Sequence, residues 1–438
     1  MRLSALVTVL GLALTPAFAA EGAPLSFAAV WQAVQAESPS QKAATAGYQA
    51  AEIASDRSGR HWLPRAFLNA RAYETNDPAQ TFFALLGERQ ATSNDFVPDV
   101  LNHPGSSFFT QAGVGLDFPI FEGGAKVAEH DALKSAAHAR SLSLQAAVVE
   151  DYLTLTRLYG GLLIMSEQEH QLRALERTVE STLQRYQLGE RGNPVGYSGL
   201  LGLKGLRNRV QAAILQNLEQ VGAFRDSLFA MAKRLPEGWS VKPQEFTAFL
   251  SETLPAPKSE SRQPSASVQS AQAMAESQAK AAEGERAKFL PKLGLSASED
   301  LTNGSRGTGT SYSAGAYLQW NLFSATDYGS VREAQFKSAE ANGNAEAQAL
   351  GERMRQSEAR HADFASTQTI QLLNENVKLL TEQTEASRKL YQSGAISALQ
   401  FLEVLSRRAD LLASLTQAEL ELLAARETEL KTSDFEVP

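Results

Sequence analysis

Four short segments of the chain alternate between apolar residues and small or polar ones. In the first segment, Leu68 and Ala70 lie on one side of an extended backbone, and Asn69 and Arg71 lie on the other. A period of two over about ten residues predicts a β-strand with one apolar face. The predicted strands cover residues 66–75, 112–118, 293–298 and 312–320. The pattern is typical of outer-membrane barrel strands, although a soluble hairpin with one buried face would also show it. The segment between the two strands of each pair is rich in turn residues, and we expect a loop there.

Long segments without proline follow the strands and predict long helices. The first covers residues 122–188, and a single helix over this range would reach roughly 100 Å. Its later part has Leu172, Leu175 and Val179 at the spacing of a heptad seam. The heptads fade midway, around Gly160, which disfavours a simple rod-like coiled coil. The second half has a similar seam, formed by Leu373, Val377, Leu380, Tyr391, Leu402, Leu405, Ala409 and Leu412.

The two halves of the chain repeat one another. Each contains a Pro-Ser pair before an Ala- and Gln-rich segment, a Leu-Pro pair before the strands, an aromatic residue where the strands end, and a Tyr-Gln-x-Gly turn. The paired landmarks are Pro39 and Pro264, Pro64 and Pro291, Phe121 and Phe323, and Gly189 and Gly394. About 70 residues separate the last two landmarks in both halves. This agreement in order and spacing indicates an internal duplication.

These landmarks divide the chain into five segments. Residues 1–20 are a predicted signal peptide, 21–234 the first repeat, 235–263 a proline-rich linker, 264–430 the second repeat, and 431–438 a C-terminal tail. The signal peptide has Arg2 ahead of an apolar run and an Ala-Phe-Ala cleavage site. Each repeat is expected to hold a helix, two strands and a helical hairpin. The linker has room for a short helix near residues 245–250.

The pattern also limits how this chain can enter a membrane. Outside the signal peptide no apolar run reaches the roughly 20 residues of a transmembrane helix. We therefore expect any insertion to use the β-strands. Four strands are too few for a membrane barrel, whose smallest examples have about eight. An open sheet would expose unpaired edges to lipid, so the strands predict a barrel shared by several copies.

Composition and motifs exclude several classes of function. The net charge of −8 argues against nucleic acid, whose binders carry basic patches. The chain has no cysteine, so we expect neither disulfides nor a lipid-modified N-terminal cysteine. Its six histidines show no metal-ligand spacing. The glycines at Gly304, Gly307 and Gly309 do not have the order of a phosphate-binding loop. We expect no enzyme activity, no cofactor and no bound metal.

The duplicated halves, the Leu-Pro pairs at 63–64 and 290–291, the strand exits at Phe121 and Phe323, and the paired Tyr-Gln-x-Gly turns resemble the TolC-like family of outer-membrane efflux proteins. The resemblance covers essentially the whole mature chain. It implies an α+β membrane protein that is mostly long α-helices forming a shared periplasmic α-barrel. Four strands per chain would contribute to a twelve-stranded barrel in a homotrimer.

The resemblance implies a function as well as a fold. Such a protein is the passive exit duct of a tripartite efflux pump or type I secretion system in a Gram-negative outer membrane. It extends into the periplasm and binds a periplasmic adaptor protein and an inner-membrane pump. Outer-membrane lipid surrounds its strands.

The resemblance also implies where the chain binds its adaptor and where the duct narrows. The family's helix-turn-helix tips map onto Tyr186, Leu188 and Gly189, and onto Tyr391, Ser393 and Gly394. The periplasmic constriction maps onto Gln400 and Glu403, of which only Glu403 is acidic. An ion pair with Arg407, one helical turn further on, is the alternative role for Glu403.

Glycines fill the first tip and the start of its returning helix. They are Gly192, Gly196, Gly199, Gly202 and Gly205. Each costs a helix interior up to about 1 kcal/mol relative to alanine. Three explanations stay open: close approach of a neighbouring helix, local opening of the tip, or a tolerated stripe of small residues. At the turns themselves, Gly189 and Gly394 are expected to have positive φ, which glycine adopts easily.

Two other classes share a signal peptide and helical hairpins. A periplasmic coiled-coil adaptor would need one hairpin and a lipoyl-like β domain, whereas here the hairpin is duplicated. A structural trimeric stalk would show sustained heptads and no barrel strands. The cargo, whether drug, metal ion, glycolipid or protein, is not indicated by the sequence.

Overall fold

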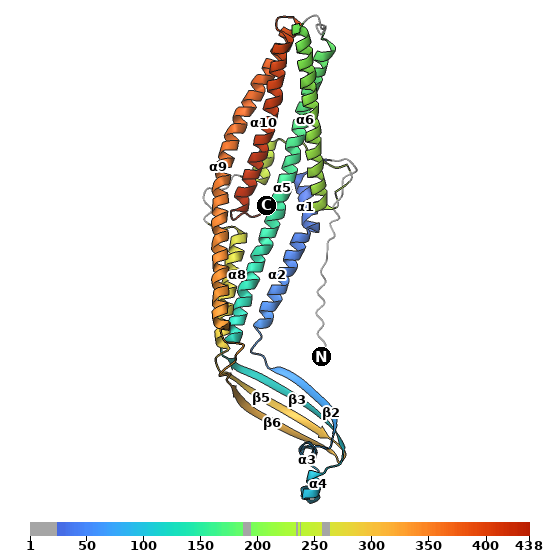
Figure 1. Cartoon of the computed structure of the whole chain (residues 1–438), viewed down its shortest axis with the longest axis vertical. Coiled ribbons are helices and arrows are strands. Elements are labelled where there is room, and N and C mark those ends of the chain that lie inside the picture. The colour runs from blue at the N-terminus through green and yellow to red at the C-terminus, as the bar shows by residue number, and fades with distance from the viewer. Residues whose placement is uncertain (1–23, 187–193, 234, 237, 256–262) are drawn as a thin grey trace, which may run out of the picture. The chain divides into compact units, whose positions relative to one another are not determined.

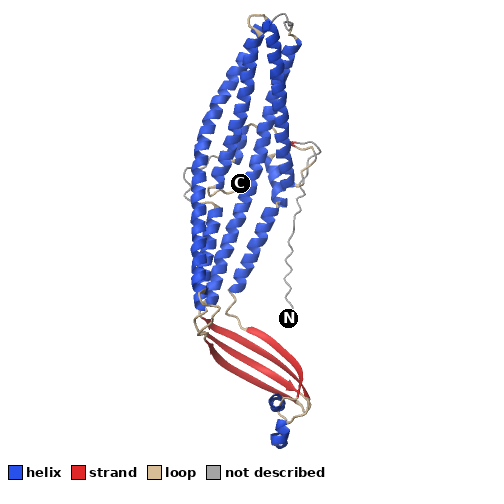
Figure 2. Ribbon diagram, viewed as in Figure 1, coloured by secondary structure: helices blue, strands red, loops and turns tan. Residues whose placement is uncertain are grey.

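The computed structural model describes residues 24–186, 194–233, 235–236, 238–255 and 263–438. The predicted signal peptide lies outside these residues. The chain forms two compact units. The strand unit consists of residues 45–143 and 267–348, and the hairpin unit of the described residues up to 44, with 144–266 and 349–438. Figure 2 shows helices and strands. Over the described ranges, no helix has both the length and the apolar character of a membrane span.

The strand unit contains one antiparallel sheet of four strands (Figure 1). Its strands are β2 (Arg65–Thr75), β3 (Ser107–Glu122), β5 (Lys292–Asn303) and β6 (Thr308–Gln319). The order across the sheet is β2-β3-β5-β6. All four predicted strands are confirmed, although β3 starts at Ser107, five residues earlier than expected. The central pair, β3 and β5, joins the two halves of the chain.

The sheet has one apolar and one polar face, as the alternation predicts. One row of the apolar face is Ala66, Leu116, Ala297 and Ala314, and one row of the polar face is Asn69, Gly113, Asp300 and Ser311. On the apolar face, which Glu299 interrupts, Leu68 is 74% exposed and Tyr312 is 86% exposed. A single chain thus leaves a broad apolar surface uncovered, which marks a surface for lipid or another chain.

The segment between β2 and β3 is not the loop that the sequence predicts. It contains α3 (Pro78–Gly87), a 3-10 turn η1 (Ser93–Phe96) and α4 (Pro98–Asn102). Asp77 caps α3, since its side chain accepts a hydrogen bond from the Gln80 backbone N–H at 2.8 Å. Pro78 occupies the first turn, where its missing N–H costs nothing. Buried Leu85 then gives the helix an apolar side. We call residues 78–104 the insertion.

Four helices continue from the opposite ends of the strands (Figure 1). They are α2 (Pro39–Ser58), α5 (Ala125–Gln184), α8 (Ala266–Ala287) and α9 (Ser330–Gln392). Within the strand unit, α5 and α8 pack through small residues. The Ser277 hydroxyl donates to the Ala132 carbonyl at 2.8 Å, and the Ser270 hydroxyl donates to the Ala139 carbonyl at 2.8 Å. Small side chains let the two backbones approach, which explains the Ala-rich composition of this segment.

The hairpin unit is built from two long helical pairs. They are α5 with α6 (Pro194–Ala232), and α9 with α10 (Ala398–Lys431). The predicted long first helix is confirmed as the 60-residue α5. It starts after Gly123 and Gly124, whose φ values of 69° and 84° turn the chain away from β3.

Shorter elements complete the unit: α1 (Phe27–Glu37), α7 (Phe246–Thr253), and a parallel pair of β1 (Pro24–Leu25) and β4 (Ser240–Val241). Helix α7 confirms the short helix expected in the linker.

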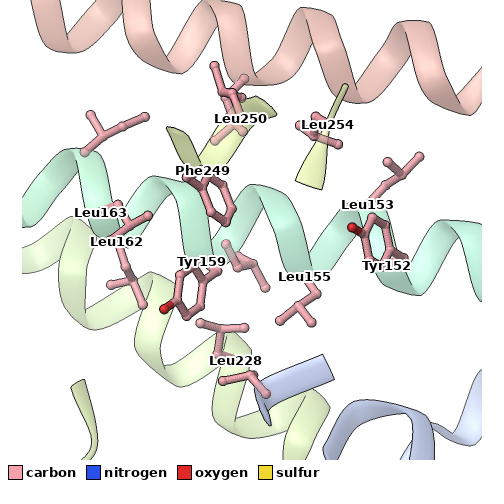
Figure 3. Packing of buried hydrophobic residues seen from close by; sticks show 14 of the residues in the cluster. Tyr152, Leu153, Leu155, Tyr159, Leu162, Leu163, Leu228, Phe249, Leu250 and Leu254 are labelled. Carbon is pink, nitrogen blue, oxygen red and sulfur yellow. The ribbon is translucent and has the colours of Figure 1, made fainter. Parts of the chain in front are cut away.

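The main core of the hairpin unit surrounds α7 (Figure 3). Phe249 is fully buried and stacks on Tyr159 of α5, with ring centroids 5.5 Å apart. A β-carbon on Gly160 would lie 2.8 Å from the Phe249 ring, and one on Gly161 would lie 2.8 Å from Phe224. The heptads fade here because α5 packs against bulky rings of α6 and α7 rather than against a single parallel partner.

Among the carboxyl groups of the hairpin unit with a raised pKa, Glu419 has a large shift. Burial, with a contribution from the nearby charge of Glu167, raises the pKa of Glu419 on α10 to about 7. The folded state then binds a proton that the unfolded chain, with the ordinary lower pKa, has already released. Stability contributed by this proton is complete below the unfolded pKa and is lost as pH rises through about 7.

We expect Glu419→Gln to relieve this loss. The stabilisation should be on the order of 2 kcal/mol larger near pH 8 than near pH 5, because one pKa unit corresponds to about 1.4 kcal/mol. Urea unfolding at both pH values measures it. Glu436→Gln is the control at the chain terminus, and an equal effect of Glu419→Gln at both pH values would contradict the assignment.

Candidate functional site at the helix tips

The second turn, between α9 and α10, is a glycine-terminated helix end. Gly394 has φ 76°, which confirms the positive value that the sequence predicts. The Ala395 N–H donates to the Leu390 carbonyl at 2.9 Å, and the Gly394 N–H donates to the Tyr391 carbonyl at 3.0 Å. This pair of hydrogen bonds is the Schellman motif, which satisfies the last carbonyls of α9. The positive φ at this position lies in the left-handed region, which glycine adopts at little cost, so the turn requires a glycine here.

The returning helix α10 starts with a capping box. The Ser397 side chain accepts from the Gln400 N–H at 3.4 Å, and the Gln400 side chain accepts from the Ser397 N–H at 2.9 Å. Two free N–H groups at the start of the helix are thereby satisfied. Gln400, a predicted constriction residue, therefore has a structural role within its own chain. Its neutral amide suits this role, and the constriction role stays a prediction.

Aromatic and aliphatic side chains hold the two hairpins together below the turns. Tyr391 stacks on the fully buried Phe401, with ring centroids 5.3 Å apart. On the first hairpin, the Tyr186 hydroxyl donates to the Gly196 carbonyl at 2.6 Å. Part of the predicted seam is buried in the core of the tip, namely Leu172, Leu175, Val179, Leu405, Ala409 and Leu412. Leu203, Leu206, Val210, Ile214 and Phe401 complete this core, whereas Leu373, Val377 and Leu380 of the predicted seam do not belong to it. The sequence analysis missed Phe401, although its spacing of four from Leu405 signals the same helix face.

The first-tip glycines have two different surroundings. A β-carbon on Gly199 would lie 2.8 Å from the Tyr186 hydroxyl and 3.0 Å from the Ala398 β-carbon, and one on Gly202 would collide with the Leu402 side chain. Gly205 has no heavy atom near its β-carbon position. Gly199 and Gly202 therefore permit close approach of α6 and α10, whereas the alternative of a tolerated small residue holds for Gly205.

The charged residues near the tip are exposed and paired. Glu403 accepts a hydrogen bond from Arg407, and both side chains are 61% exposed. Arg209 of α6 forms an ion pair with Asp410 of α10. The ion pair of Glu403 with Arg407, the alternative considered from the sequence, thus forms within one chain.

A cleft of about 840 Å³ lies at the tip. Its lining includes Arg185, Tyr186, Arg388, Tyr391 and Ser393. Burial raises the pKa of both Tyr186 and Tyr391, so these hydroxyls stay neutral hydrogen-bonding groups. Of the predicted docking residues, Tyr186, Tyr391, Ser393 and Gly394 thus lie together around one cleft, while Leu188 and Gly189 lie outside the described residues.

The second half of the chain matches a known protein family. The family model described as outer membrane efflux protein matches residues 258–431. No curated protein sequence matches the chain.

Solved structures match over nearly its whole length. The chain is similar to CusC, a protein described as forming a transmembrane channel, with a TM-score of 0.76, 11% identity, and coverage of 93% of this chain and 92% of that chain. For the outer membrane protein VceC from Vibrio cholerae the TM-score is 0.73, at 15% identity over 94% and 97% of the two chains. For the Campylobacter jejuni CmeC outer membrane channel it is 0.71, at 14% identity over 92% and 84%.

The fold is therefore that of outer-membrane channels. Through residues 258–431, the second half of the chain resembles the outer membrane efflux protein family.

Proposed function

We propose that three copies of this chain form the outer-membrane exit duct of a tripartite efflux pump or a type I secretion system. The observation that carries the proposal is the four-stranded sheet, which is uncovered on its apolar face and has β2 and β6 as its edge strands. If β6 of one copy pairs with β2 of the next, three copies give a closed barrel and no strand edge remains. The apolar face then meets lipid and the polar face lines the duct.

The helix tips are proposed to bind the periplasmic adaptor. The supporting feature is the arrangement of Tyr186, Tyr391 and Gly394 around one cleft, where hydrogen bonds fix the second turn. A rigid turn loses little conformational freedom on binding, which favours a docking role. The adaptor delivers cargo from the inner-membrane pump. Neither the adaptor nor the cargo is specified by these residues.

The state of assembly and two adjacent residues of β6 test the proposal. Purified protein should be a detergent-solubilised trimer by light scattering. Tyr312→Lys should abolish outer-membrane assembly, because lysine on the lipid face of a barrel costs about 2–4 kcal/mol near the membrane centre. The control Ser313→Lys introduces lysine on the polar face instead, and this variant should assemble normally. A stable, water-soluble monomer, or equal tolerance of both substitutions, would exclude the barrel.

A further prediction concerns the proposed constriction at Glu403. In a trimer, three copies of this carboxylate would surround one axis and attract cations, because a charged ring at a narrow point focuses its field. We expect Glu403→Gln to reduce the cation preference in planar bilayers, measured as a shift of the reversal potential.

The ion pair of Glu403 with Arg407 supplies a control of opposite sign. Arg407→Gln frees the carboxylate and removes a positive charge, so it should increase the cation preference. If both variants leave the reversal potential unchanged, the two residues form only a surface ion pair, which contributes about 0.2–0.5 kcal/mol to the helix.

A further inference from the structure

The insertion lies against the polar face of the sheet. Thr302 and Gly309 share a row of that face, and Thr302 is only 9% exposed. A β-carbon on Gly87, at the end of α3, would lie 3.0 Å from the Thr302 hydroxyl. One on Gly309 would collide with the Gly87 carbonyl and would lie 3.1 Å from the Glu88 α-carbon. The end of α3 therefore covers the polar face where the strands end, far from the four long helices.

The glycines of the β5–β6 hairpin make room for this contact. A β-carbon on Gly304 would collide with the Glu88 carboxylate, and one on Gly307 would lie 3.3 Å from the Gln90 side chain. Gly304, Gly307 and Gly309 are the same three glycines whose order in the sequence does not match a phosphate-binding loop. Their absence of side chains lets the backbone of residues 87–90 lie directly on the hairpin.

An ion pair between half-exposed Arg306 and buried Asp95 holds the insertion to the same hairpin. The Arg306 guanidinium donates two hydrogen bonds to the Asp95 carboxylate, at 2.7 and 2.8 Å. The Arg306 backbone N–H donates to Glu88 at 3.2 Å. Asp95 is 3% exposed and Glu88 is 1% exposed. The hydrogen bonds from Arg306 hold the pKa of Asp95 well below its usual range, so mild acid does not break the contact. A two-pronged pair of this kind also fixes orientation.

The rest of the insertion is loosely packed. A cavity of about 140 Å³ lies between it and the hairpin, with Thr81, Leu101 and Arg306 in its lining. Phe83 and Phe96 are 68% and 56% exposed. The ion pair and the glycine contacts, rather than a large apolar core, therefore determine where the insertion lies.

We propose that the insertion is a lid over the outer end of the duct, held in place by the ion pair of Arg306 with Asp95. The proposal rests on the proposed function, because the polar face lines a duct only if several copies share a barrel. Each copy then contributes one lid to the mouth. Loss of the ion pair frees the lid and widens the mouth for bulky solutes.

The absence of native cysteine allows a direct test on intact cells. Ser313→Cys places a reporter on the polar face, four residues along β6 from Gly309, at an exposed position. A small maleimide should label it readily, whereas a polymer-linked maleimide should label it slowly. Adding Arg306→Ala should accelerate labelling by the polymer reagent several-fold and leave labelling by the small reagent unchanged.

Two further variants make the result specific. Arg306→Lys keeps the charge but loses the two-pronged contact, and should give an intermediate rate even if Arg306→Ala fails to assemble. Arg60→Ala removes the same charge at the other end of the strands and should have no effect.

The outcomes separate the lid from the duct. Asp99→Cys, exposed on α4, should be labelled on intact cells by both reagents if this end of the sheet faces outward. Suppose that Asp99→Cys is labelled, and that both reagents label Ser313→Cys at equal rates whether or not Arg306 is present. This result overturns the lid and leaves the proposed function intact. If neither reporter is labelled on intact cells, the proposed function itself fails.

Discussion

Replacing Phe249 with alanine should destabilise the hairpin unit by about 3–5 kcal/mol, the range for truncating a buried aromatic residue. Phe249 is fully buried and contacts two other rings, with centroids 5.5 Å away at Tyr159 and 5.7 Å away at Phe27. Gly160 lies directly behind the ring and has no side chain that could fill the space. The cavity would therefore persist, and the loss of transfer free energy would be accompanied by a cavity term.

Tryptophan fluorescence can follow this loss. Trp31 and Trp239 belong to the same buried cluster and are 6% and 3% exposed, so unfolding of this region changes their emission. Phe364→Ala makes the same substitution on α9 at a side chain that is 70% exposed, and should stay within about 0.5 kcal/mol of the parent protein. If the urea midpoint falls by the same amount in both variants, or falls in neither, then α7 does not anchor this core.

The second large effect is expected at the tip. Gly199→Val should separate α6 from α10, because its β-carbon would lie 3.0 Å from the Ala398 β-carbon, which has no other rotamer to adopt. It would also lie 2.8 Å from the Tyr186 hydroxyl, which cannot move without losing its hydrogen bond to Gly196. Under the proposed function, the contact of α6 with α10 at the tip should loosen, and single-channel conductance in planar bilayers should rise several-fold.

Gly205→Val is the matched control for this experiment. It lies on the same helix and changes helix propensity by the same amount, yet no heavy atom lies within 4 Å of its β-carbon position. We expect the conductance of Gly205→Val to equal that of the parent channel. Equal conductance of both variants would mean that contact between α6 and α10 does not set the width of the tip.

Features with a local cause could be predicted from the sequence. The alternation around Leu68 and Asn69 specifies a strand and its faces, because strand period is a property of consecutive residues. The turn at Gly394 could be predicted for the same reason, since chain reversal there requires a particular backbone conformation. The capping box of Ser397 and Gln400 is equally local, although the sequence analysis assigned Gln400 only to the constriction.

Features with a distant cause could not be predicted. Gly160 and Gly199 both interrupt helical segments in the sequence, and only the rings and side chains packed against them distinguish their roles. The sequence predicts a loop at the insertion because its turn residues outweigh the helix-starting signal at Asp77 and Pro78. Its position depends on Arg306, 211 residues away from Asp95 in sequence.

The pairing of β3 with β5 also determines when the sheet can form. Thr110 pairs with Asn303, and their side chains are joined across a separation of 193 residues. Contacts at such separations carry a high loop-closure entropy and form slowly. A chain that emerges from its N-terminus has β2 and β3 available long before β5 exists, so the inner edge of β3 stays unpaired during that time. An unpaired edge is a template for association with other chains. The order of elements therefore predicts a need for protection of the first two strands until the second half of the chain has been exported.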